Sequence, residues 1–392
     1  MTVPRAQALA VAAAFRSRFG GTPAVFSAPG RVNLIGEHTD YTGGFALPIA
    51  IAERTWVAAA LRSDGVLRAY SSDLGEERAS SLDAPWRRSG SFLDYVEGVA
   101  RVLRGSGAAV TGADLFVSSE VPTGAGLSSS AALELAVGLA LTTLAGDTVA
   151  LGELARVGQL AENDYVGARV GAMDQLASAL GREGHALLID CRSLAVTPVE
   201  LPRAPVELLV ADTHVKHSHA ESGYNQRRAE CERALELLRA AGHELESLRD
   251  LTPEALDAVV PALPEPLGRR VSHVVRENAR TLAAADALRH GHLDTFGRLM
   301  NGSHASLRDD FEVSAPELDH LVSEAQRRPG VLGARLTGGG FGGSVLVLVE
   351  RAEAQAVQQA LVKTFQARFG REPTLRVARA SPGARAERLP AV

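Results

Sequence analysis

The turn that decides the fold is Val121-Pro-Thr-Gly-Ala-Gly-Leu-Ser-Ser-Ser-Ala-Ala132, which joins a strand-like run to a long helical pattern. Its glycines allow positive φ angles and a close approach of the backbone to a ligand. Its serines stand at the start of the helix, where unpaired N–H groups and the positive end of the helix dipole attract anions. One capping serine would explain an ordinary helix start. The combination instead predicts a phosphate-binding turn made of Gly124, Gly126, Leu127, Ser128, Ser129 and Ser130.

A second glycine-rich segment, Leu336-Thr-Gly-Gly-Gly-Phe-Gly-Gly-Ser344, precedes an apolar run that is typical of a buried strand. Five glycines in six positions raise the entropy of the unfolded chain, so stability does not explain them. Such a segment forms a tight hairpin turn, or it makes room for a ligand or another backbone. The residues alone leave these alternatives open.

A third segment, Ala28-Pro-Gly-Arg-Val-Asn-Leu-Ile-Gly-Glu-His-Thr-Asp-Tyr-Thr-Gly-Gly44, crowds four polar side chains into ten residues: Arg31, Glu37, His38 and Asp40. Carboxylates and imidazole suit a polyhydroxylated ligand because they fix hydrogen bonds to neighbouring hydroxyls. The alternative is a solvated loop with surface ion pairs. Apolar residues interleave with the polar ones, which favours a half-buried binding segment.

Strand-like runs and helical patterns follow one another without strict alternation, which predicts an α+β fold. The predicted strands are Ala24–Ser27, Phe45–Ile51, Thr55–Leu61, Val66–Tyr70, Asp114–Ser119, Ala186–Ile189, Leu208–Ala211 and Ser344–Glu350. The predicted helices are Phe92–Leu103, Leu127–Leu144, Val149–Asp164, Ala172–Leu180, Tyr224–Ala241, Arg269–Arg289, Leu293–Leu307 and Ala352–Arg368. The chain of 392 residues is long for one core, so two domains are expected. Three prolines between residues 198 and 205 favour a boundary that gives domains 1–195 and 196–392.

The composition excludes several classes of protein. A net charge of −5 gives no basic footprint for nucleic acid. Two distant cysteines give no disulfide framework, so a cytoplasmic location is expected. The chain has no apolar run long enough for a membrane span. Its apolar start, Ala6–Phe15, has helical spacing through Phe19 and lacks a cleavage site, so we interpret it as an amphipathic helix and not as a signal peptide.

The three segments together resemble the galactokinase family. Residues 30–44 are similar to the signature of galactokinases. The turn at 121–132 resembles the ATP-binding motif of the wider superfamily of galactokinase, homoserine kinase, mevalonate kinase and phosphomevalonate kinase. The segment 336–344 resembles the third motif of that superfamily. The order and spacing of the motifs match, and the likeness spans the chain. It implies a two-domain α+β fold, with an N-terminal domain like ribosomal protein S5 and a ferredoxin-like C-terminal domain.

Two further stretches share the resemblance. Ala161–Gln175 is similar to the stretch that carries a metal-binding glutamate and the catalytic aspartate, which here are Glu162 and Asp174. Val215–Arg228 resembles the stretch that places a tyrosine, here Tyr224, against the sugar. Without the resemblance, Asp174 would be interpreted as a helix cap. The histidines at 214, 217 and 219 have no spacing typical of a zinc site, and the family keeps no metal there.

The resemblance implies a reaction in which Mg·ATP phosphorylates the C1 hydroxyl of galactose. Asp174 would lie beside that hydroxyl, either as a base or as an orienting anion, and Arg31 would keep it ionised and stabilise the transferring phosphoryl group. The implied sugar contacts are Glu37, His38, Asp40, Gly171, Asp174 and Tyr224. The implied ligands of Mg²⁺ are Ser130 and Glu162, and the residues that would border the phosphates include Gly338, Gly339 and Gly340. No protein partner is implied.

Two other functions compete with this one. A kinase for N-acetylgalactosamine or galacturonate would share the signature loop, so the loop does not exclude it. A regulator that senses galactose and ATP without catalysis would be expected to lose part of the serine-rich motif, which is complete here. For the adenine pocket, Phe92 and Tyr95 stand near positions where relatives use aromatic residues, but Phe92 replaces the usual tryptophan.

Overall fold

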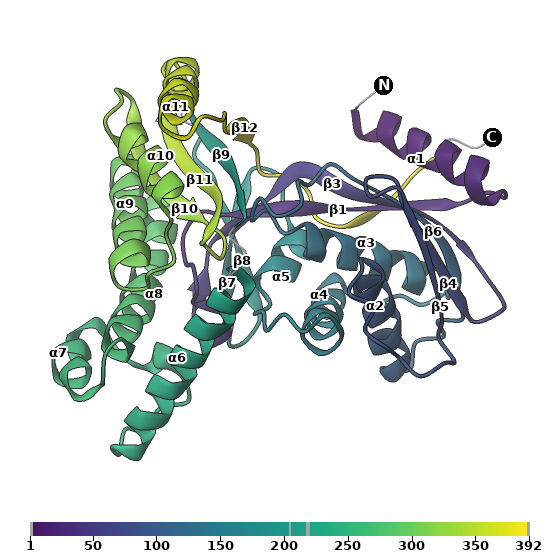
Figure 1. The fold of residues 1–392 in the computed structure, drawn as a ribbon, viewed down its shortest axis with the longest axis horizontal. Coiled ribbons are helices and arrows are strands. Elements are labelled where there is room, and N and C mark those ends of the chain that lie inside the picture. Colours follow the sequence, from purple (N-terminus) through teal and green to yellow (C-terminus); the bar gives the residue numbers. More distant parts are fainter. Residues whose placement is uncertain (1–2, 204, 217–219, 390–392) are drawn as a thin grey trace.

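The computed structural model describes residues 3–203, 205–216 and 220–389. Figure 1 shows a part with a long sheet on one side of the molecule and a mainly helical part on the other. The strands are β1 Ala24–Asn33, β2 Phe45–Ala46, β3 Pro48–Leu61, β4 Val66–Ser71, β5 Glu76–Ser81, β6 Ala113–Ser119, β7 His185–Asp190, β8 Ala195–Glu200, β9 Val206–Lys216, β10 Val331–Thr337, β11 Gly342–Glu350, β12 Thr374–Ala378 and β13 Arg385–Glu387. The helices are α1 Val3–Phe19, α2 Leu93–Gly105, α3 Ser129–Leu144, α4 Leu151–Ala161, α5 Met173–Leu180, α6 Ala220–Ala240, α7 Leu256–Val259, α8 Leu267–Arg289, α9 Leu293–Asp309, α10 Pro316–Gln326 and α11 Ala354–Phe369.

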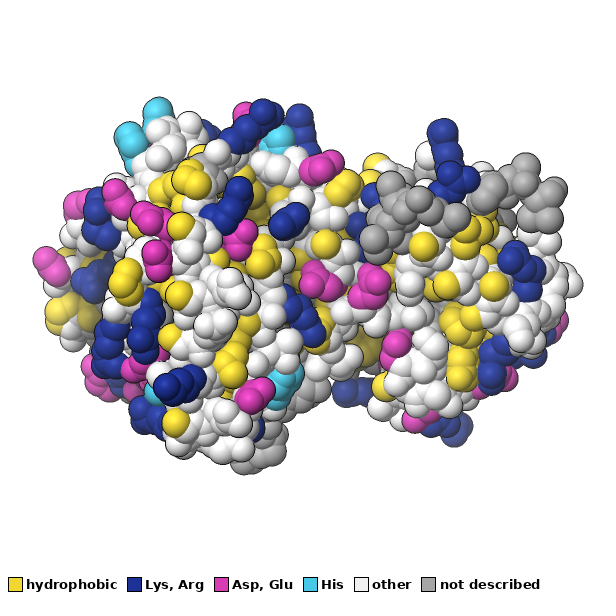
Figure 2. All heavy atoms as spheres, turned by 90° about the horizontal axis from the view of Figure 1, so that it is seen from above, with side chains coloured by type: hydrophobic (Ala, Val, Ile, Leu, Met, Phe, Trp, Pro, Cys, Tyr) yellow, Lys and Arg dark blue, Asp and Glu magenta, His cyan; other side chains and the backbone are white. Residues whose placement is uncertain are grey.

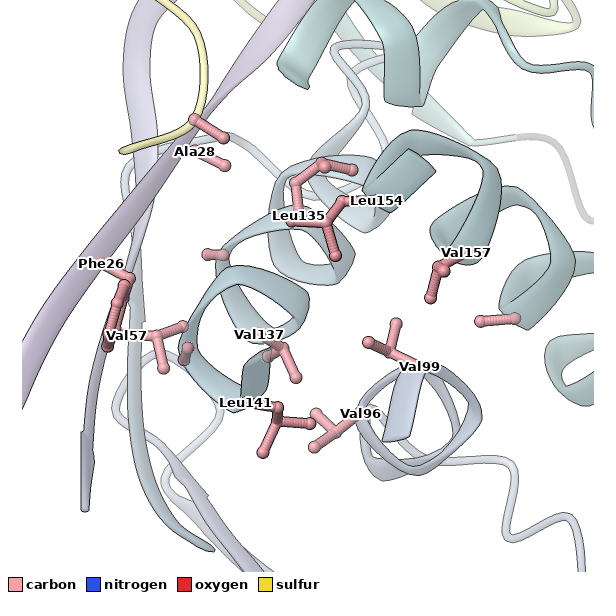
Figure 3. Packing of buried hydrophobic residues seen from close by; sticks show 14 of the residues in the cluster. Phe26, Ala28, Val57, Val96, Val99, Leu135, Val137, Leu141, Leu154 and Val157 are labelled. Carbon is pink, nitrogen blue, oxygen red and sulfur yellow. The ribbon is translucent and has the colours of Figure 1, made fainter. Parts of the chain in front are cut away.

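The long sheet has the strand order β13-β1-β3-β6-β4-β5, and its pairs are antiparallel except β4 with β6. Helix α1 covers one face, and α2 to α5 lie on the other (Figure 1). Helix α3 is apolar around most of its circumference and is buried between the sheet and the neighbouring helices. In Figure 3, Phe26 and Val57 of the sheet face α3, and Val99 and Val157 close the layer from α2 and α4. This packing fixes the start of α3, where the serine-rich turn lies.

The mainly helical part is built on an antiparallel sheet with the order β10-β11-β9-β12. Strand β11 is buried along nearly its whole length, as its apolar sequence predicts. A small third sheet, β2-β7-β8, adjoins α8 through contacts with β2 and β8. The α+β class predicted from the sequence is therefore confirmed.

Several elements differ from the sequence-based expectations. Strand β1 extends to Asn33, so the first part of the segment 28–44, the sugar-signature segment, is a strand and not a loop. The remainder, residues 34–44, is the sugar-signature loop. The expected helix from Leu127 begins at Ser129, because Ser128 has a positive φ of 59° that a helix does not accept. Helices α7 and α10 and strands β5, β8, β10, β12 and β13 are not among the elements expected from the sequence.

The division at residue 195 remains a prediction. Strand β8 begins at Ala195 and pairs with β7, so one small sheet contains residues from both sides of that position. The end of the chain returns to the long sheet, where β13 pairs with β1. Among the described residues, no helix has both the length and the apolar character needed to cross a membrane. Basic and acidic side chains are interspersed on the face shown in Figure 2.

Candidate active site

A cavity of about 320 Å³ brings all three motifs together. Its lining comes from β1 and the loop after it, the serine-rich turn, the start of α5, helix α6 and the β10–β11 turn. The predicted residues in this lining are Arg31, Glu37, His38, Asp40, Gly124, Gly126, Leu127, Ser128, Ser129, Ser130, Asp174, Tyr224, Gly338 and Gly339. Segments more than 300 residues apart in the sequence thus form one surface, which is suited to a polar ligand.

Arg31 reaches the cavity because β1 is irregular just before it. The register with β3 shifts between Pro29 and Arg31. Gly30 lets the strand approach the serine-rich turn, since a Cβ there would lie 2.6 Å from the carbonyl oxygen of Leu127. The N–H of Arg31 donates to that same carbonyl oxygen at 3.0 Å. The glycine of the signature therefore serves a backbone contact, and this contact aims the arginine.

Asp174 and Arg31 form a two-point ion pair at the centre of the cavity. Arg31 Nε donates to Asp174 Oδ1 and Nη2 donates to Oδ2, both at 2.8 Å. The hydroxyl of Ser128 donates to Oδ2 at 2.5 Å, and Arg31 Nη1 donates to the carbonyl oxygen of Gly126 at 2.6 Å. The arginine side chain is 5% exposed, whereas the aspartate is 23% exposed. The carboxylate is thus held rigidly while one side stays open to a ligand.

The serine-rich turn and the third motif pack backbone against backbone. Gly338 has φ +86°, and a Cβ there would lie 3.1 Å from the carbonyl oxygen of Gly126. The hydroxyl of Ser344 donates to the carbonyl oxygen of Ala125 at 2.7 Å. The segment 338–341 is also the hairpin turn between β10 and β11, so it serves as a turn and as a contact for another backbone. Gly340 faces away from the cavity, because a Cβ there would lie 2.3 Å from the carbonyl oxygen of Val313.

Glu37 is buried and makes its contacts with the third motif. Its Oε1 accepts from the N–H of Gly338 at 2.7 Å and from Arg335 Nη1 at 3.4 Å. Burial raises the pKa of Glu37, although the charges of Arg335 and Arg31 oppose the rise. Glu37 therefore joins the sugar-signature loop to β10 as well as lining the cavity.

His38 lies in a group of aromatic rings. It has a positive φ of 60°, a strained conformation for a residue with a side chain. Its Nε2 donates to the carbonyl oxygen of Gly339 at 3.1 Å, and its Nδ1 accepts from the hydroxyl of Tyr41 at 3.0 Å. The ring of Tyr224 lies 5.3 Å from the His38 ring. Burial lowers the pKa of His38 to about 3, so the imidazole is neutral and acts in hydrogen bonding.

Asp40 begins a short helical turn, Asp40–Thr42, and faces Gly171. A Cβ at Gly171 would lie 2.2 Å from Asp40 Oδ2, so only glycine leaves room for this carboxylate. Gly171 is therefore beside the cavity although it is not part of its lining. Burial and the charge of Asp174 raise the pKa of Asp40 to about 6.

Glu162, Glu134 and Gln175 form a buried acidic group next to Ser130. The side chain of Ser130 hydrogen-bonds to Glu162. Gln175 Nε2 donates to Glu162 Oε2 at 2.9 Å and to Glu134 Oε2 at 3.0 Å. Burial raises the pKa of both glutamates; the charge of Glu162 raises the pKa of Glu134 further, and the charge of Asp174 raises that of Glu162. No buried cation of the protein pairs with them among the described residues, so the group fits an added divalent cation.

A second cavity of about 170 Å³ shares Ser129 and Ser130 with the first. Thr55, Phe92, Tyr95 and Leu133 contribute to its wall. The two serines thus lie between a polar cavity and a partly aromatic one. This is the arrangement that a nucleotide needs when its phosphates and base occupy different sites.

Sequence reasoning missed some residues of the site. Asn225 and Met173 line the cavity and are direct neighbours of predicted residues. Glu134 stands four residues after Ser130, which is one helical turn and could have placed it near the metal ligands. Arg335 carries no local signal because its partners are about 300 residues away. Residues 217–219, part of the stretch around Tyr224, lie outside the described residues.

Comparison with known proteins agrees with this geometry. Residues 13–61 match the family model described as the galactokinase galactose-binding signature. Residues 94–182 and 284–367 match the N-terminal and C-terminal domains of the GHMP kinases. The galactokinase of Roseiflexus sp. (strain RS-1) is 47% identical over 94% of each chain. The chain belongs to the galactokinase family.

Other members of the galactokinase family support the same assignment. The galactokinase of Streptomyces coelicolor is 46% identical over 96% of this chain and 97% of its own. The structure of Lactococcus lactis galactokinase complexed with galactose matches with a TM-score of 0.93 at 38% identity, over 96% of this chain and 99% of that chain. The mevalonate kinase of Methanococcus jannaschii, at 18% identity and a TM-score of 0.66, shares the fold.

Proposed function

We propose that this protein transfers the γ-phosphoryl group of ATP to the C1 hydroxyl of α-D-galactose and yields galactose 1-phosphate and ADP. The observation that carries the proposal is the ion pair of Asp174 and Arg31, which lies where the sugar-signature loop meets the serine-rich turn. A sugar hydroxyl and a phosphate bound in this cavity would both lie next to that pair. The proposed sugar contacts are Glu37, His38, Asp40, Gly171, Asp174 and Tyr224.

In the proposed reaction, the C1 oxygen attacks the γ-phosphorus and the bond from that phosphorus to the β–γ bridging oxygen breaks. Asp174 has four acceptor positions, and Arg31 and Ser128 fill three of them. The fourth is available to the C1 hydroxyl and can orient it or accept its proton. Arg31 adds positive charge beside the transferring group. Phosphoryl transfer depends mainly on such positioning and charge neutralisation.

We propose that Ser130 and Glu162 hold the magnesium ion. Hydroxyl and carboxylate oxygens are ligands that Mg²⁺ accepts, with water and phosphate oxygens in the remaining positions. The raised pKa of Glu162 and the unpaired Oε1 of buried Glu134 indicate a missing positive charge. When bound, the ion would neutralise charge on the β- and γ-phosphates. Gln175 orients the Glu162 carboxylate toward this position.

The nucleotide fits across the two adjacent cavities. The N–H groups at the start of α3 would hold the phosphates, bordered by Gly338 and Gly339. The nucleoside would occupy the smaller cavity, against Phe92 and Tyr95. The proposed location is the cytoplasm, where ATP is available; both cysteines are free thiols, which suits a reducing compartment.

The test is a coupled assay of ADP release with Mg·ATP and a panel of galactose, 2-deoxygalactose, N-acetylgalactosamine, glucose and galacturonate. Turnover confined to galactose and its 2-deoxy analogue supports the proposal. Efficient turnover of N-acetylgalactosamine or galacturonate instead of galactose would replace the substrate and keep the catalytic centre. Silence on every sugar, with both ligands still bound, would indicate a sensing protein.

A further inference from the structure

Helix α8 contacts the sugar-signature loop although it lies about 240 residues away in the sequence. The contacts come from His273 and Glu277, which are four residues apart and share one face of the helix, and from Asn278, which lies about 100° further round it. Each of the three hydrogen-bonds to the loop segment 36–45 through that segment's backbone. This arrangement leaves the side chains of the loop free to face the cavity.

Glu277 makes the central contact. Its Oε1 accepts from the backbone N–H of Gly36 at 3.1 Å and from that of Glu37 at 3.4 Å. The same oxygen accepts from the hydroxyl of Ser303 on α9 at 2.5 Å, and Oε2 accepts from Arg280 Nε at 2.7 Å. The side chain is fully buried. A buried carboxylate with four donors is a rigid anchor, because both of its oxygens are held.

His273 and Asn278 hold the loop on either side of this anchor. His273 Nε2 donates to the carbonyl oxygen of Glu37 at 3.1 Å. Asn278 Oδ1 accepts from the N–H of Phe45 at 2.9 Å, at the far end of the loop. Gly44 makes this second contact possible, since a Cβ there would lie 2.2 Å from Asn278 Oδ1. The helix therefore holds both ends of the segment that carries the sugar-facing side chains.

Charge strengthens the anchor. Burial alone would raise the pKa of Glu277, but the charges of Arg280 and Arg335 and the hydrogen bond from Ser303 contribute to lowering it to about 2. Arg335 is fully buried and also contacts Glu37 Oε1. Arg335 thus pairs directly with Glu37 on the loop, and its charge also lowers the pKa of Glu277 behind the loop. Helix α8, strand β10 and the loop are connected by this group of charges.

We propose that Glu277, assisted by Asn278, is a positioning residue for the sugar: it fixes the backbone of residues 36–45 so that Glu37, His38 and Asp40 meet the substrate in register. This inference rests on the proposed function, because it assumes that the loop binds the sugar. Neither residue lines the cavity, so both act through the loop and not by contact with the substrate. Without either side chain the loop would be less ordered before the sugar binds, so binding would have to order it.

The test compares Glu277→Gln, Glu277→Ala and Asn278→Ala with wild type by steady-state kinetics on whichever panel sugar the wild type turns over. For Glu277→Ala and Asn278→Ala we expect the sugar KM to rise about tenfold, because buried N–H groups of the loop lose their acceptor. Glu277→Gln keeps an acceptor oxygen and should recover part of the loss. The KM for ATP should stay within about twofold of wild type, since the serine-rich turn is untouched.

A merely structural role would give a different result. Destabilisation lowers the amount of folded enzyme and therefore the apparent kcat and the melting temperature, but it leaves the KM of the folded fraction unchanged. Asp286→Asn is the matched control, because Asp286 is an exposed carboxylate on the same helix. If Glu277→Ala does not fold, Asn278→Ala carries the test.

The possible outcomes separate the two claims. An unchanged sugar KM in Asn278→Ala and in every Glu277 variant that folds overturns the positioning role while the proposed function stands. A wild type that turns over no sugar overturns both. A selective rise in sugar KM, with partial recovery by glutamine, supports the positioning role.

Discussion

Three side-chain donors converge on the carboxylate of Asp174 and fix its orientation. Arg31 supplies two of these donors and Ser128 supplies the third. Ser128 itself has a positive φ, a conformation that non-glycine residues seldom adopt, and this conformation lets its hydroxyl reach the carboxylate. Strain at Ser128 and at His38 is thus found on both sides of the cavity, where the protein positions side chains that the proposed reaction uses.

The first prediction concerns Asp174 itself. Asp174→Asn keeps the shape of the side chain but removes its charge and most of its ability to accept a proton. We expect kcat to fall at least about 100-fold. The circular dichroism spectrum should be unchanged, and calorimetry should still detect nucleotide binding. A variant that kept more than about a tenth of the wild-type kcat would place the reacting hydroxyl elsewhere.

The second prediction concerns the effect of pH on sugar binding. Burial and the charge of Asp174 raise the pKa of Asp40 to about 6, so Asp40 is largely protonated below that pH and ionised above it. A carboxylate accepts two sugar hydroxyls better than a carboxylic acid does. The galactose affinity should therefore fall about tenfold as the pH is lowered from about 7 to about 5.

Calorimetry without nucleotide or metal measures sugar binding alone, so the pH dependence of metal binding does not enter. Asp40→Asn should bind more weakly at pH 7 and should lose most of the pH dependence. A wild-type affinity that stays constant over this range would show that Asp40 does not titrate in contact with the sugar.

At the scale of elements, the cavity depends on close approaches that only glycine allows. Gly30 brings β1 to the serine-rich turn, and Gly338 brings the β10–β11 turn to the same place. Gly171 makes the third approach, between the segment before α5 and the turn that carries Asp40. These close approaches explain why the motifs contain so many glycines, although each glycine raises the entropy of the unfolded chain and so lowers the stability of the fold.

The third prediction uses this crowding. In Gly171→Ala the new methyl group would lie 2.2 Å from Asp40 Oδ2, so the carboxylate must rotate away. The end of a side chain moves more easily than a backbone, and we expect the fold to survive. The galactose KM should rise about tenfold or more, while the KM for ATP changes little. Gly152→Ala is the control, because a Cβ there meets open space. Equal effects on both substrates would mean that the change spreads beyond the sugar loop.

Some elements could be predicted from the sequence because their signal is local. Helix α5 was predicted to within one residue, and α8 to within two, since both repeat apolar residues at a helical period. Helix α10 was missed although Pro316 stands at its first position and Leu318, Leu321 and Val322 follow at helical spacing.

Other elements have no local signal. Strands β5 and β13 are edge strands with polar sequences, so only their partners specify them. The residues predicted as the site from motifs do meet in one cavity, apart from Gly171 and Glu162, which lie beside it, and Gly340, which faces away from it. The roles of Glu277 and Arg335 could not be predicted from the sequence. Their burial and their hydrogen bonds depend on partners from distant segments of the chain.

At the scale of the whole molecule, the end of the chain connects the two parts. After β12 the chain returns to the long sheet, and Gly383 and Ala384 donate backbone hydrogen bonds to Gly181 and Ser178. The hydroxyl of Ser178 donates in turn to the carbonyl oxygen of Pro29, next to the irregular part of β1 that aims Arg31. The C-terminal segment thus supports the active site from behind.

The fourth prediction follows from one buried charge at this junction. Arg54 is 3% exposed and donates to the carbonyl oxygens of Pro382 at 2.8 Å and Gly383 at 2.7 Å. A chain that ends at residue 380 would deprive this guanidinium of both carbonyl acceptors, and hydrogen bonds to a charged group contribute about 1.5–3 kcal/mol each. The melting temperature should fall by about 5 °C or more.

The controls for this truncation test whether the buried charge is the cause. A chain that ends at Leu389 keeps β13 and should melt like the full chain. Introducing Arg54→Met into the chain that ends at residue 380 should restore part of the lost stability, because an apolar side chain needs no partner. If the short chain melts within about 2 °C of the full one, the C-terminal segment covers the sheet without stabilising it. If Arg54→Met lowers stability further, the loss comes from the missing strand β13 and not from the unpaired guanidinium.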